Sequence, residues 1–461
     1  MGSSLDPTRG RGKLALPYMD AELPLNIDLS RRDVLKLAGY SSLAAFIAAC
    51  GGTTTTTNTG TGGSMSLGSY NTDPNSKKGT QAIIDAFTTA NGGTKVKINT
   101  VDHGTFQNQI SSYLQGTPED AFTWFSGHRM RFFADKGLAT PIDDVWDKVK
   151  GNYTEGFAAS IKGNDGHAYA IPTDYYPWAV FYRKDVFAAH SYKVPTNWDD
   201  FKALCVQMRK DGLIPVAMAD KDGWPAQGTF DIINLRLNGY DFHTELLTGK
   251  QKWTDPRVKA VYTKWSEITQ YYSPALAGLT WQQGADQLLR KQAGMYLLGL
   301  FVSDEFKASG QPADLEQLDF FPFPDLGTQY DAEKALDAPI DVYMLTKKSP
   351  TLNANLAQAK AFMEFVSKGS TQVLYWQNAP GSIPTANDAD TSQYPALTKK
   401  AVQIVSSAKR ITQYFDRDSR PDFSGPNGMQ GFLLKFLANP KQDTTSLQGQ
   451  MQSFWDSLPP E

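Results

Sequence analysis

Strand-like and helix-like segments alternate along this chain from Ser66 onward, and that order limits the fold more than any other feature. Met65–Tyr70 is predicted to be a short strand, and Lys77–Ala90 has apolar residues at helical spacing. Further strands are predicted at 95–101, 121–125, 178–182, 293–300 and 340–346, and further helices at 105–114, 129–136, 198–211, 255–271, 282–292, 353–367, 394–407, 428–437 and 446–458. A strand–helix–strand–helix order predicts an α/β fold with a mainly parallel sheet.

The N-terminal residues carry an export signal that takes no part in this fold. Arg31 and Arg32 precede the apolar run Leu35–Ala49, which is shorter than the roughly 20 residues of a membrane span. Paired arginines before such a run are typical of a twin-arginine signal. The run ends in small residues and Cys50, which resembles the bacterial lipobox. We therefore predict that residues 1–49 are a signal peptide and that Cys50 is lipidated; the alternative is a buried helix that begins with two arginines.

The rest of the chain is predicted to form a tether and two lobes. Residues 50–64 are rich in Thr and Gly and uncharged, as expected of a flexible tether. Without the first 49 of its 461 residues the chain keeps 412, which suits two lobes better than one core. We predict that 65–172 with 336–386 forms lobe I and that 173–335 with 387–461 forms lobe II.

Composition excludes several classes of function. The formal net charge of −3 argues against a nucleic acid as partner, and no later segment approaches membrane-spanning length. The chain has two cysteines, so a lipidated Cys50 leaves Cys205 without a disulfide partner and excludes a Cys-based zinc site. The five histidines are scattered, which disfavours a metal hydrolase. We predict no metal and no cofactor.

Three blocks of sequence follow one another in a fixed order. The first comprises EDAFTW at 119–124, GHR at 127–129 and ADKGLATPI at 134–142. The second comprises GHAYAIP at 166–172, FYRKDVF at 181–187 and VPTNWDDF at 194–201, and the third is AGMYLLG at 293–299. Together they resemble the extracellular solute-binding proteins of bacterial ABC importers, in the maltose and multiple-sugar branch. The resemblance covers essentially the whole mature chain.

This resemblance implies a periplasmic-binding-protein type of α/β fold, in which a hinge joins two lobes and the ligand lies in the cleft between them. It implies a carbohydrate ligand, ABC permease subunits as partners, and no enzymatic activity. With the signal and Cys50, it implies a monomer that is exported and held by lipid on the outer face of the cell membrane, or in the periplasm.

Carbohydrates require aromatic side chains for their C–H faces and polar side chains for their hydroxyls, and both kinds recur at predicted strand ends. The candidate binding residues are Asn71 and Asp73 after the first strand, Trp124, His128 and Arg129 around the third, Tyr176 and Trp178 at the first crossing between lobes, Trp224 in a polar loop, Phe301, Asp341 at a return crossing, and Asp418 and Arg420 in a charged run.

For each candidate a structural role is the alternative. The alternative is a core position for Trp124 and packing between the lobes for Trp178. For Asp73-Pro74 it is a turn, and for the charged run it is exposure to solvent or pairing within the run. Phe301 replaces the Trp that is usual in the family, and His128 stands where the family often has an acidic residue. No stacking aromatic is evident near Asn427, which indicates a site of different length.

Three other functions fit parts of the sequence. A secreted carbohydrate-active hydrolase would use paired carboxylates, but no motif positions an acid and a nucleophile. A sugar sensor or adhesin could share the fold without a permease. Tyr175 and Tyr176 resemble the tandem tyrosines of ferric-ion binding proteins, but no His/Glu set accompanies them.

Overall fold

The computed structural model describes residues 63–460, and these residues contain two larger β-sheets and a third sheet of two short strands. The predicted twin-arginine signal, Cys50 and all but the last residues of the tether lie outside the described residues. No helix within 63–460 is both long enough and apolar enough to cross a membrane.

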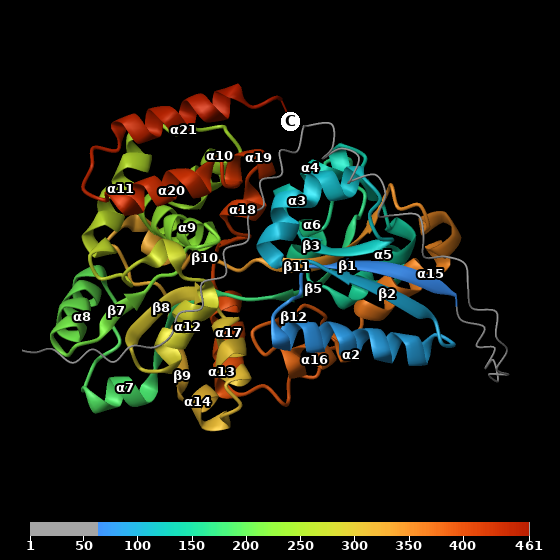
Figure 1. The fold of residues 1–461 in the computed structure, drawn as a ribbon, viewed down its shortest axis with the longest axis horizontal. Coiled ribbons are helices and arrows are strands. Elements are labelled where there is room, and N and C mark those ends of the chain that lie inside the picture. The colour runs from blue at the N-terminus through green and yellow to red at the C-terminus, as the bar shows by residue number, and fades with distance from the viewer. Residues whose placement is uncertain (1–62, 461) are drawn as a thin grey trace, which may run out of the picture. The chain divides into compact units, whose positions relative to one another are not determined.

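The larger sheet has the strand order β12-β5-β11-β3-β1-β2, with β4 paired to β11 (Figure 1). Its strands are β1 Ser64–Ser69, β2 Lys95–Thr100, β3 Ala121–Phe125, β4 Ala139–Thr140, β5 Ala170–Tyr175, β11 Ile340–Thr346 and β12 Ile383–Pro384. Strand β1 is parallel to β2 and β3, whereas β11 is antiparallel to β3, β4 and β5. The prediction of a mainly parallel sheet was therefore wrong. The reason is that β11 arrives from the second sheet and enters in the reverse direction.

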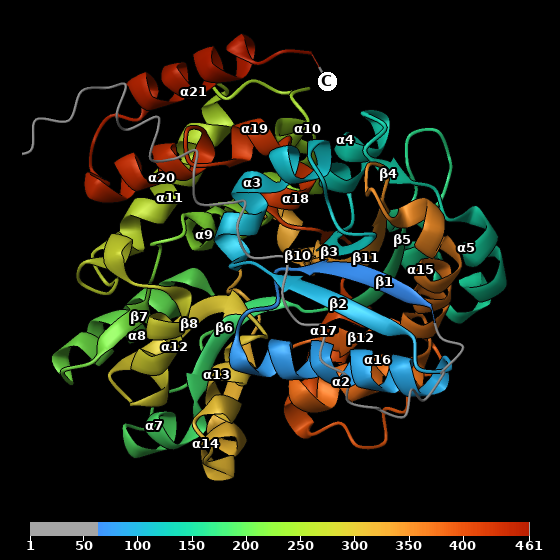
Figure 2. The ribbon, with the colours of Figure 1, turned by 45° about the vertical axis from the view of Figure 1, so that its right-hand side comes forward.

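Helices cover both faces of the larger sheet. Figures 1 and 2 show α2 beside α16 on one face, and α3 and α4 on the other. Helix α2 begins with Pro74 at its first turn and buries Ile83, Ile84 and Phe87. The helices of this part are α2 Pro74–Ala90, α3 His103–Gln115, α4 His128–Asp135, α5 Asp143–Val149, η1 Lys150–Asn152, α6 Glu155–Ser160, α15 Leu352–Val366 and α16 Gly369–Asn378.

The second sheet has the order β7-β8-β6-β9. Its strands are β6 Trp178–Arg183, β7 Ile214–Ala217, β8 Ala293–Gly299 and β9 Leu318–Phe321. Every residue of β6 and β8 is buried, as expected for strands covered by helices on both faces. The helices around it are α7 Lys184–Ala189, α8 Trp198–Lys210, α9 Trp224–Asn238, α10 Tyr240–Leu247, α11 Pro256–Thr269, η2 Leu276–Gly278, α12 Trp281–Leu289, α13 Val302–Ala308, α14 Pro312–Gln317, η3 Gln329–Glu333, α17 Ala396–Ser407, α18 Phe415–Asp418, α19 Pro421–Ser424, α20 Met429–Ala438 and α21 Thr445–Ser457.

The chain passes between the two sheets more than once. The first crossing lies between the end of β5 at Tyr175 and the start of β6 at Trp178. The return crossing follows β10 Leu336–Asp337, which pairs in parallel with β13 Ile411–Thr412, and leads directly into β11. The ends of strands from both sheets therefore lie near the crossings, which is where the site described next is found.

Candidate functional site

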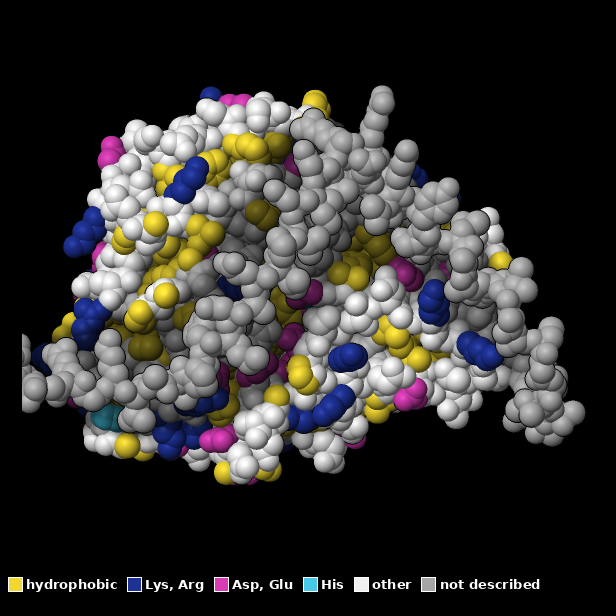
Figure 3. Space-filling view, viewed as in Figure 1, with side chains coloured by type: hydrophobic (Ala, Val, Ile, Leu, Met, Phe, Trp, Pro, Cys, Tyr) yellow, Lys and Arg dark blue, Asp and Glu magenta, His cyan; other side chains and the backbone are white. Residues whose placement is uncertain are grey.

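A cleft of about 990 Å³, its open mouth included, lies among the crossings and is lined by residues from both sheets and their helices. Its walls come from the loop after β1, the start of α3, the segment between β5 and β6, the first turns of α9 and α12, and the region around α18. Figure 3 shows acidic side chains gathered near the middle of one face of the molecule.

Aromatic side chains form one wall of this cleft. Phe301 is the centre of the group, with ring centroids 5.0 Å from Trp281, 5.9 Å from Trp224 and 5.2 Å from Tyr176. Trp178 lies behind them and packs on Tyr414 at 5.0 Å. Trp224 and Phe301 keep part of their surface exposed, whereas Trp178 is buried. The wall therefore offers apolar ring faces to a ligand.

Helix α9 brings Trp224 to this wall because of its first residues. Gly223, at φ 75°, adopts the left-handed conformation directly before the helix, and Pro225 occupies the first turn. The Tyr414 hydroxyl donates to the Trp224 carbonyl and accepts from the Gly228 amide at 3.1 Å. The backbone around Trp224 is thus held independently of its side chain.

Arg417 provides the fixed positive charge in the cleft lining. Its Nη1 lies 2.8 Å from Asp341 Oδ1, its Nη2 donates to the Tyr176 hydroxyl at 2.7 Å, and its guanidinium lies 3.9 Å from the centre of the Phe125 ring. Burial raises the pKa of Asp341, and Arg417 partly opposes that rise. The neighbouring Asp416 pairs with Arg129 Nη1 at 3.4 Å, so both arginines of this region have acidic partners.

Two carboxyl groups lie on adjacent strands, that of the half-buried Asp341 in the cleft lining and that of the buried Asp174. Asp341 of β11 and Asp174 of β5 are cross-strand neighbours in the larger sheet. Burial, together with the charge of Asp341, raises the pKa of Asp174. Like charges placed opposite each other on a sheet are unfavourable, so the pair favours retention of a proton.

The mouth of the cleft is polar and mostly acidic. Gln282 of α12 donates to Asp73 Oδ1 at 2.7 Å, which links the loop after β1 to the second sheet's helices. Asp102 caps α3 by accepting from the Thr105 amide at 3.0 Å. Burial lowers the pKa of His103 to about 3, so the imidazole is neutral at pH 7. This set accepts many hydrogen bonds, as a ligand rich in hydroxyl groups requires.

Seven of the twelve residues predicted from the sequence line this cleft: Asn71, Asp73, Tyr176, Trp178, Trp224, Phe301 and Asp341. The prediction brought together side chains from both sheets that are up to 270 positions apart in sequence. Whether each of these residues contacts a ligand stays a prediction.

The structure places the other five predicted residues outside the cleft lining. Trp124 is fully buried in β3 and stacks on Phe125 at 4.7 Å, and Arg129 is buried beside Asp416. Asp418 accepts from the Gln413 amide at 2.9 Å, and Arg420 donates to Asp422 and to the Pro459 carbonyl. His128 begins α4 and is absent from the residues that line the cleft.

Several lining residues were not predicted from the sequence. The charged run drew attention to Asp418 and Arg420, whereas Asp416 and Arg417 of the same run line the cleft. Trp281 opens α12 after a Thr280 capping box, a signal that the sequence displays. The others are Tyr70, Thr72, Ser76, Asp102, His103, Gly104, Gln107, Asp222, Gln282, Asp304, Pro339, Tyr375, Ser382 and Tyr414.

The family model described as bacterial extracellular solute-binding protein matches residues 72–369. The chain belongs to this family. An uncharacterized ABC transporter extracellular-binding protein of Pyrococcus horikoshii is 26% identical to it over 341 residues, 72% of this chain and 74% of the relative. A probable sugar-binding periplasmic protein of Brucella melitensis is 25% identical over 293 residues, 61% of this chain and 65% of the relative.

Among solved structures, the bacterial solute receptor AcbH has a TM-score of 0.81 and 40% sequence identity, and the match covers 86% of this chain and 99% of AcbH. AcbH is described as having an exclusive preference for β-D-galactopyranose. A chitin oligosaccharide binding protein shares the fold at a TM-score of 0.76 and 19% identity, over 86% of this chain and 99% of its own. These matches confirm the family and the fold class that the three sequence blocks predicted.

Proposed function

We propose that this protein binds a carbohydrate in the cleft and delivers it to the permease subunits of an ABC transporter. The observation that carries the proposal is the pairing of an aromatic wall, Phe301 with Trp224 and Trp281, with an acidic mouth and Arg417. Flat apolar faces and many acceptors are the two surfaces that a sugar ring needs.

We assign roles to the residues as follows. Trp224 and Phe301 stack on the C–H face of the sugar, and Asp73, Asn71 and Asp341 accept from its hydroxyls. Arg417 donates, because its planar fork is held by Asp341 and Tyr176. The likeness to AcbH supports a single hexopyranose of the galactose type as the first ligand to test.

Isothermal titration calorimetry with D-galactose, D-glucose and raffinose tests this proposal. We expect saturable binding of at least one sugar and an upward shift of the melting temperature with its concentration. Binding without a product on chromatography supports a receptor, and release of a cleavage product supports the hydrolase instead. Absence of binding to every mono- and oligosaccharide in a broad screen would contradict the proposal.

The proposal also includes export of the protein and its attachment to the membrane by lipid. Arg31 and Arg32 direct export of the folded chain, Cys50 carries the lipid, and the monomer is held at the membrane by that anchor alone. Replacement Cys50→Ser is expected to move the protein from the membrane fraction to the soluble exported fraction. A membrane-bound C50S protein would contradict lipid anchoring at this residue.

A further inference from the structure

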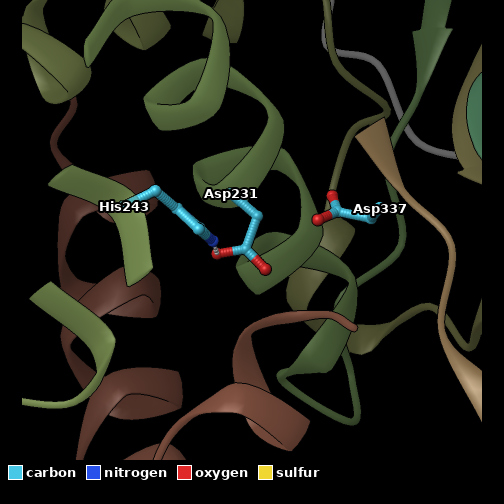
Figure 4. Close-up of side chains that lie close together, drawn as sticks. All are labelled: Asp231, His243 and Asp337. Carbon is cyan, nitrogen blue, oxygen red and sulfur yellow. Dashed lines mark ion pairs between the residues drawn. The ribbon is translucent and has the colours of Figure 1, made fainter. Parts of the chain in front are cut away.

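Three buried side chains meet inside the second sheet's half of the protein, away from the cleft lining. Asp231 comes from α9, His243 from α10 and Asp337 from β10, and Figure 4 shows their polar atoms turned toward one another. One potential ligand atom from each residue lies within 4.8 Å of the other two, and His243 Nε2 lies 3.8 Å from Asp231 Oδ1. All three residues are 0% exposed.

Their polar atoms lack hydrogen-bond partners among the residues that the structure describes. By ordinary hydrogen-bond geometry, both carboxylate oxygens of Asp231, Nε2 of His243 and Oδ2 of Asp337 are buried and unpaired, although the Phe415 backbone amide is near enough to Asp231 to lower the pKa of its carboxyl. The other Asp337 oxygen accepts from the Thr412 hydroxyl. Buried polar atoms are nearly always paired, and four unpaired atoms at one place point to a missing common partner.

The charge of this cluster is also uncompensated. Within residues 63–460 no Lys or Arg forms an ion pair with Asp231 or Asp337. The charged groups that act on the two carboxyls are themselves acidic, Asp416 and Asp418. A buried carboxylate requires a counter-charge or a proton, so the cluster must hold a cation or protons.

We propose that Asp231, His243 and Asp337 bind a divalent transition-metal ion, Zn²⁺ or Mn²⁺. Two carboxylates neutralise the ion, and imidazole nitrogen with carboxylate oxygen is a donor set that suits these metals. With metal–ligand distances of about 2.0–2.2 Å, tetrahedral coordination places ligand atoms about 3.3–3.6 Å apart. The ligand atoms lie within 4.8 Å of one another here, so the widest pair has to close by up to about 1.5 Å when the metal binds. The metal would join α9 and α10 to β10, the strand that leads into the return crossing.

Coordination through Nε2 sets a condition on the other histidine nitrogen. When a metal occupies Nε2, the imidazole proton lies on Nδ1, which then donates. Asn234 Nδ2 lies 3.0 Å from Nδ1 and is also a donor, so the two groups conflict as they stand. The Asn234 amide has to turn so that its oxygen accepts, which breaks the bond that Asn238 Nδ2 donates to Asn234 Oδ1 at 2.8 Å. Asn238 keeps its bond to the Arg257 carbonyl. One hydrogen bond is small beside the free energy of structural metal binding.

The test uses the full chain, purified without a polyhistidine tag, loaded with Zn²⁺ or Mn²⁺ and dialysed. We expect about one metal ion per chain by inductively coupled plasma mass spectrometry, and a lower melting temperature after treatment with EDTA. Asp337→Asn is expected to lose the metal. The matched control Asp241→Asn, an exposed residue of the same helix as His243, is expected to keep it.

The variant Asp231→Asn separates the metal from a cluster neutralised by protons. If a metal is bound, D231N loses it and melts at a lower temperature that EDTA no longer changes. If protons neutralise the carboxyls, the neutral amide preserves stability, the wild-type chain carries no stoichiometric metal, and EDTA has no effect; this outcome overturns the proposal. The metal content of the wild-type chain tests the proposal even if a variant fails to fold. Sugar binding is measured in a separate experiment, so failure of the metal site and failure of the proposed function can be told apart.

Discussion

At the scale of single residues, Arg417 connects three parts of the chain that lie far apart in sequence. It contacts Asp341 of β11, Tyr176 at the first crossing and the ring of Phe125 in β3. A guanidinium can do this because its planar fork donates in fixed directions while its face stacks on a ring. Its side chain is 5% exposed, so removal of Asp341 would leave this buried charge with Asp416, 4.0 Å from its Nε, as its remaining acidic partner. The polar geometry of the cleft therefore depends strongly on this one residue.

Trp224→Ala tests the aromatic wall. The Tyr414 hydroxyl holds the Trp224 backbone carbonyl, so we expect the fold to survive while the stacking surface is lost. Affinity for the sugar should fall by at least roughly 2 kcal/mol, the loss typical of an aromatic anchor. Calorimetry measures the affinity, and an unchanged melting temperature without ligand confirms that the fold is intact. An unchanged affinity would remove Trp224 from the binding site.

The sequence predicted the aromatic residues of the cleft better than the charged ones. Trp224, Phe301 and Tyr176 each follow a recognisable strand or turn signal. Arg417 was missed although Arg420, three positions later, was named. Helix α18 spans only Phe415–Asp418, and four residues are too few to display a periodic pattern that says which charges point inward.

At the scale of elements, α9 contributes Trp224 to the aromatic wall and is buried on nearly all sides. The sequence analysis placed Trp224 in a loop, because Asp-Gly-Trp-Pro contains turn-forming residues. The structure corrects this: Trp224 is the first residue of α9. A helix without a polar face has no amphipathic period, so the pattern that revealed α2 was missing here.

Gly228→Ala tests the close packing of α9. A Cβ at this position would lie 2.7 Å from the Tyr414 ring and closer still to the Trp178 ring. We expect the two rings to move apart and the free energy of unfolding to fall by about 1–3 kcal/mol. Chemical denaturation measures it. The matched control is Gly449→Ala in α21, where nothing lies within 4 Å and the change should be neutral or stabilising. Equal effects of both variants would contradict the packing argument.

Asp304→Asn tests the link that α13 makes to the larger sheet's helices. Asp304 Oδ1 accepts from the Gly381 amide at 2.9 Å, its backbone carbonyl accepts from Asn75 Nδ2, and burial raises the pKa of its carboxyl to about 8. Between pH 4 and pH 8 the folded chain then holds a proton that the unfolded chain has released, so stability falls as pH rises, by at most about 1.4 kcal/mol per pH unit.

The asparagine variant keeps the acceptor and has no proton to lose. We expect the difference in the free energy of unfolding between pH 5 and pH 8 to be smaller in D304N than in the wild-type chain. Urea denaturation at the two pH values measures it. The same pH dependence in both proteins would show that Asp304 is ionised in the folded state at neutral pH.

At the scale of the whole molecule, the order of elements was predictable but the direction of β11 was not. Strand β11 pairs with β3 although more than 200 residues separate them, and it does so after the chain has passed through the second sheet. Local sequence patterns predict whether a segment is a helix or a strand, but they do not predict which distant strand it pairs with or in which direction. Chain length and the family resemblance both predicted two lobes, and the resemblance added the hinge and the cleft between them.

Cys205 offers a probe of how the two sheets' halves are coupled. It lies fully buried on α8, and burial raises the pKa of its thiol to about 12, so the folded chain should resist alkylation. In a Cys50→Ser chain it is the single thiol. Labelling by iodoacetamide then requires opening of the second sheet's core, and mass spectrometry measures its rate.

A sugar bound in the cleft stabilises the states in which the cleft is intact, and so opposes any opening that disrupts it. If Cys205 becomes accessible only by opening that destroys the cleft, ligand at 100 times its Kd should slow labelling about 100-fold. Opening confined to α8 and β7 would leave the rate unchanged, because neither element contributes a residue to the cleft lining. The ratio of the two rates therefore separates a molecule that unfolds as one cooperative unit from one whose halves open independently.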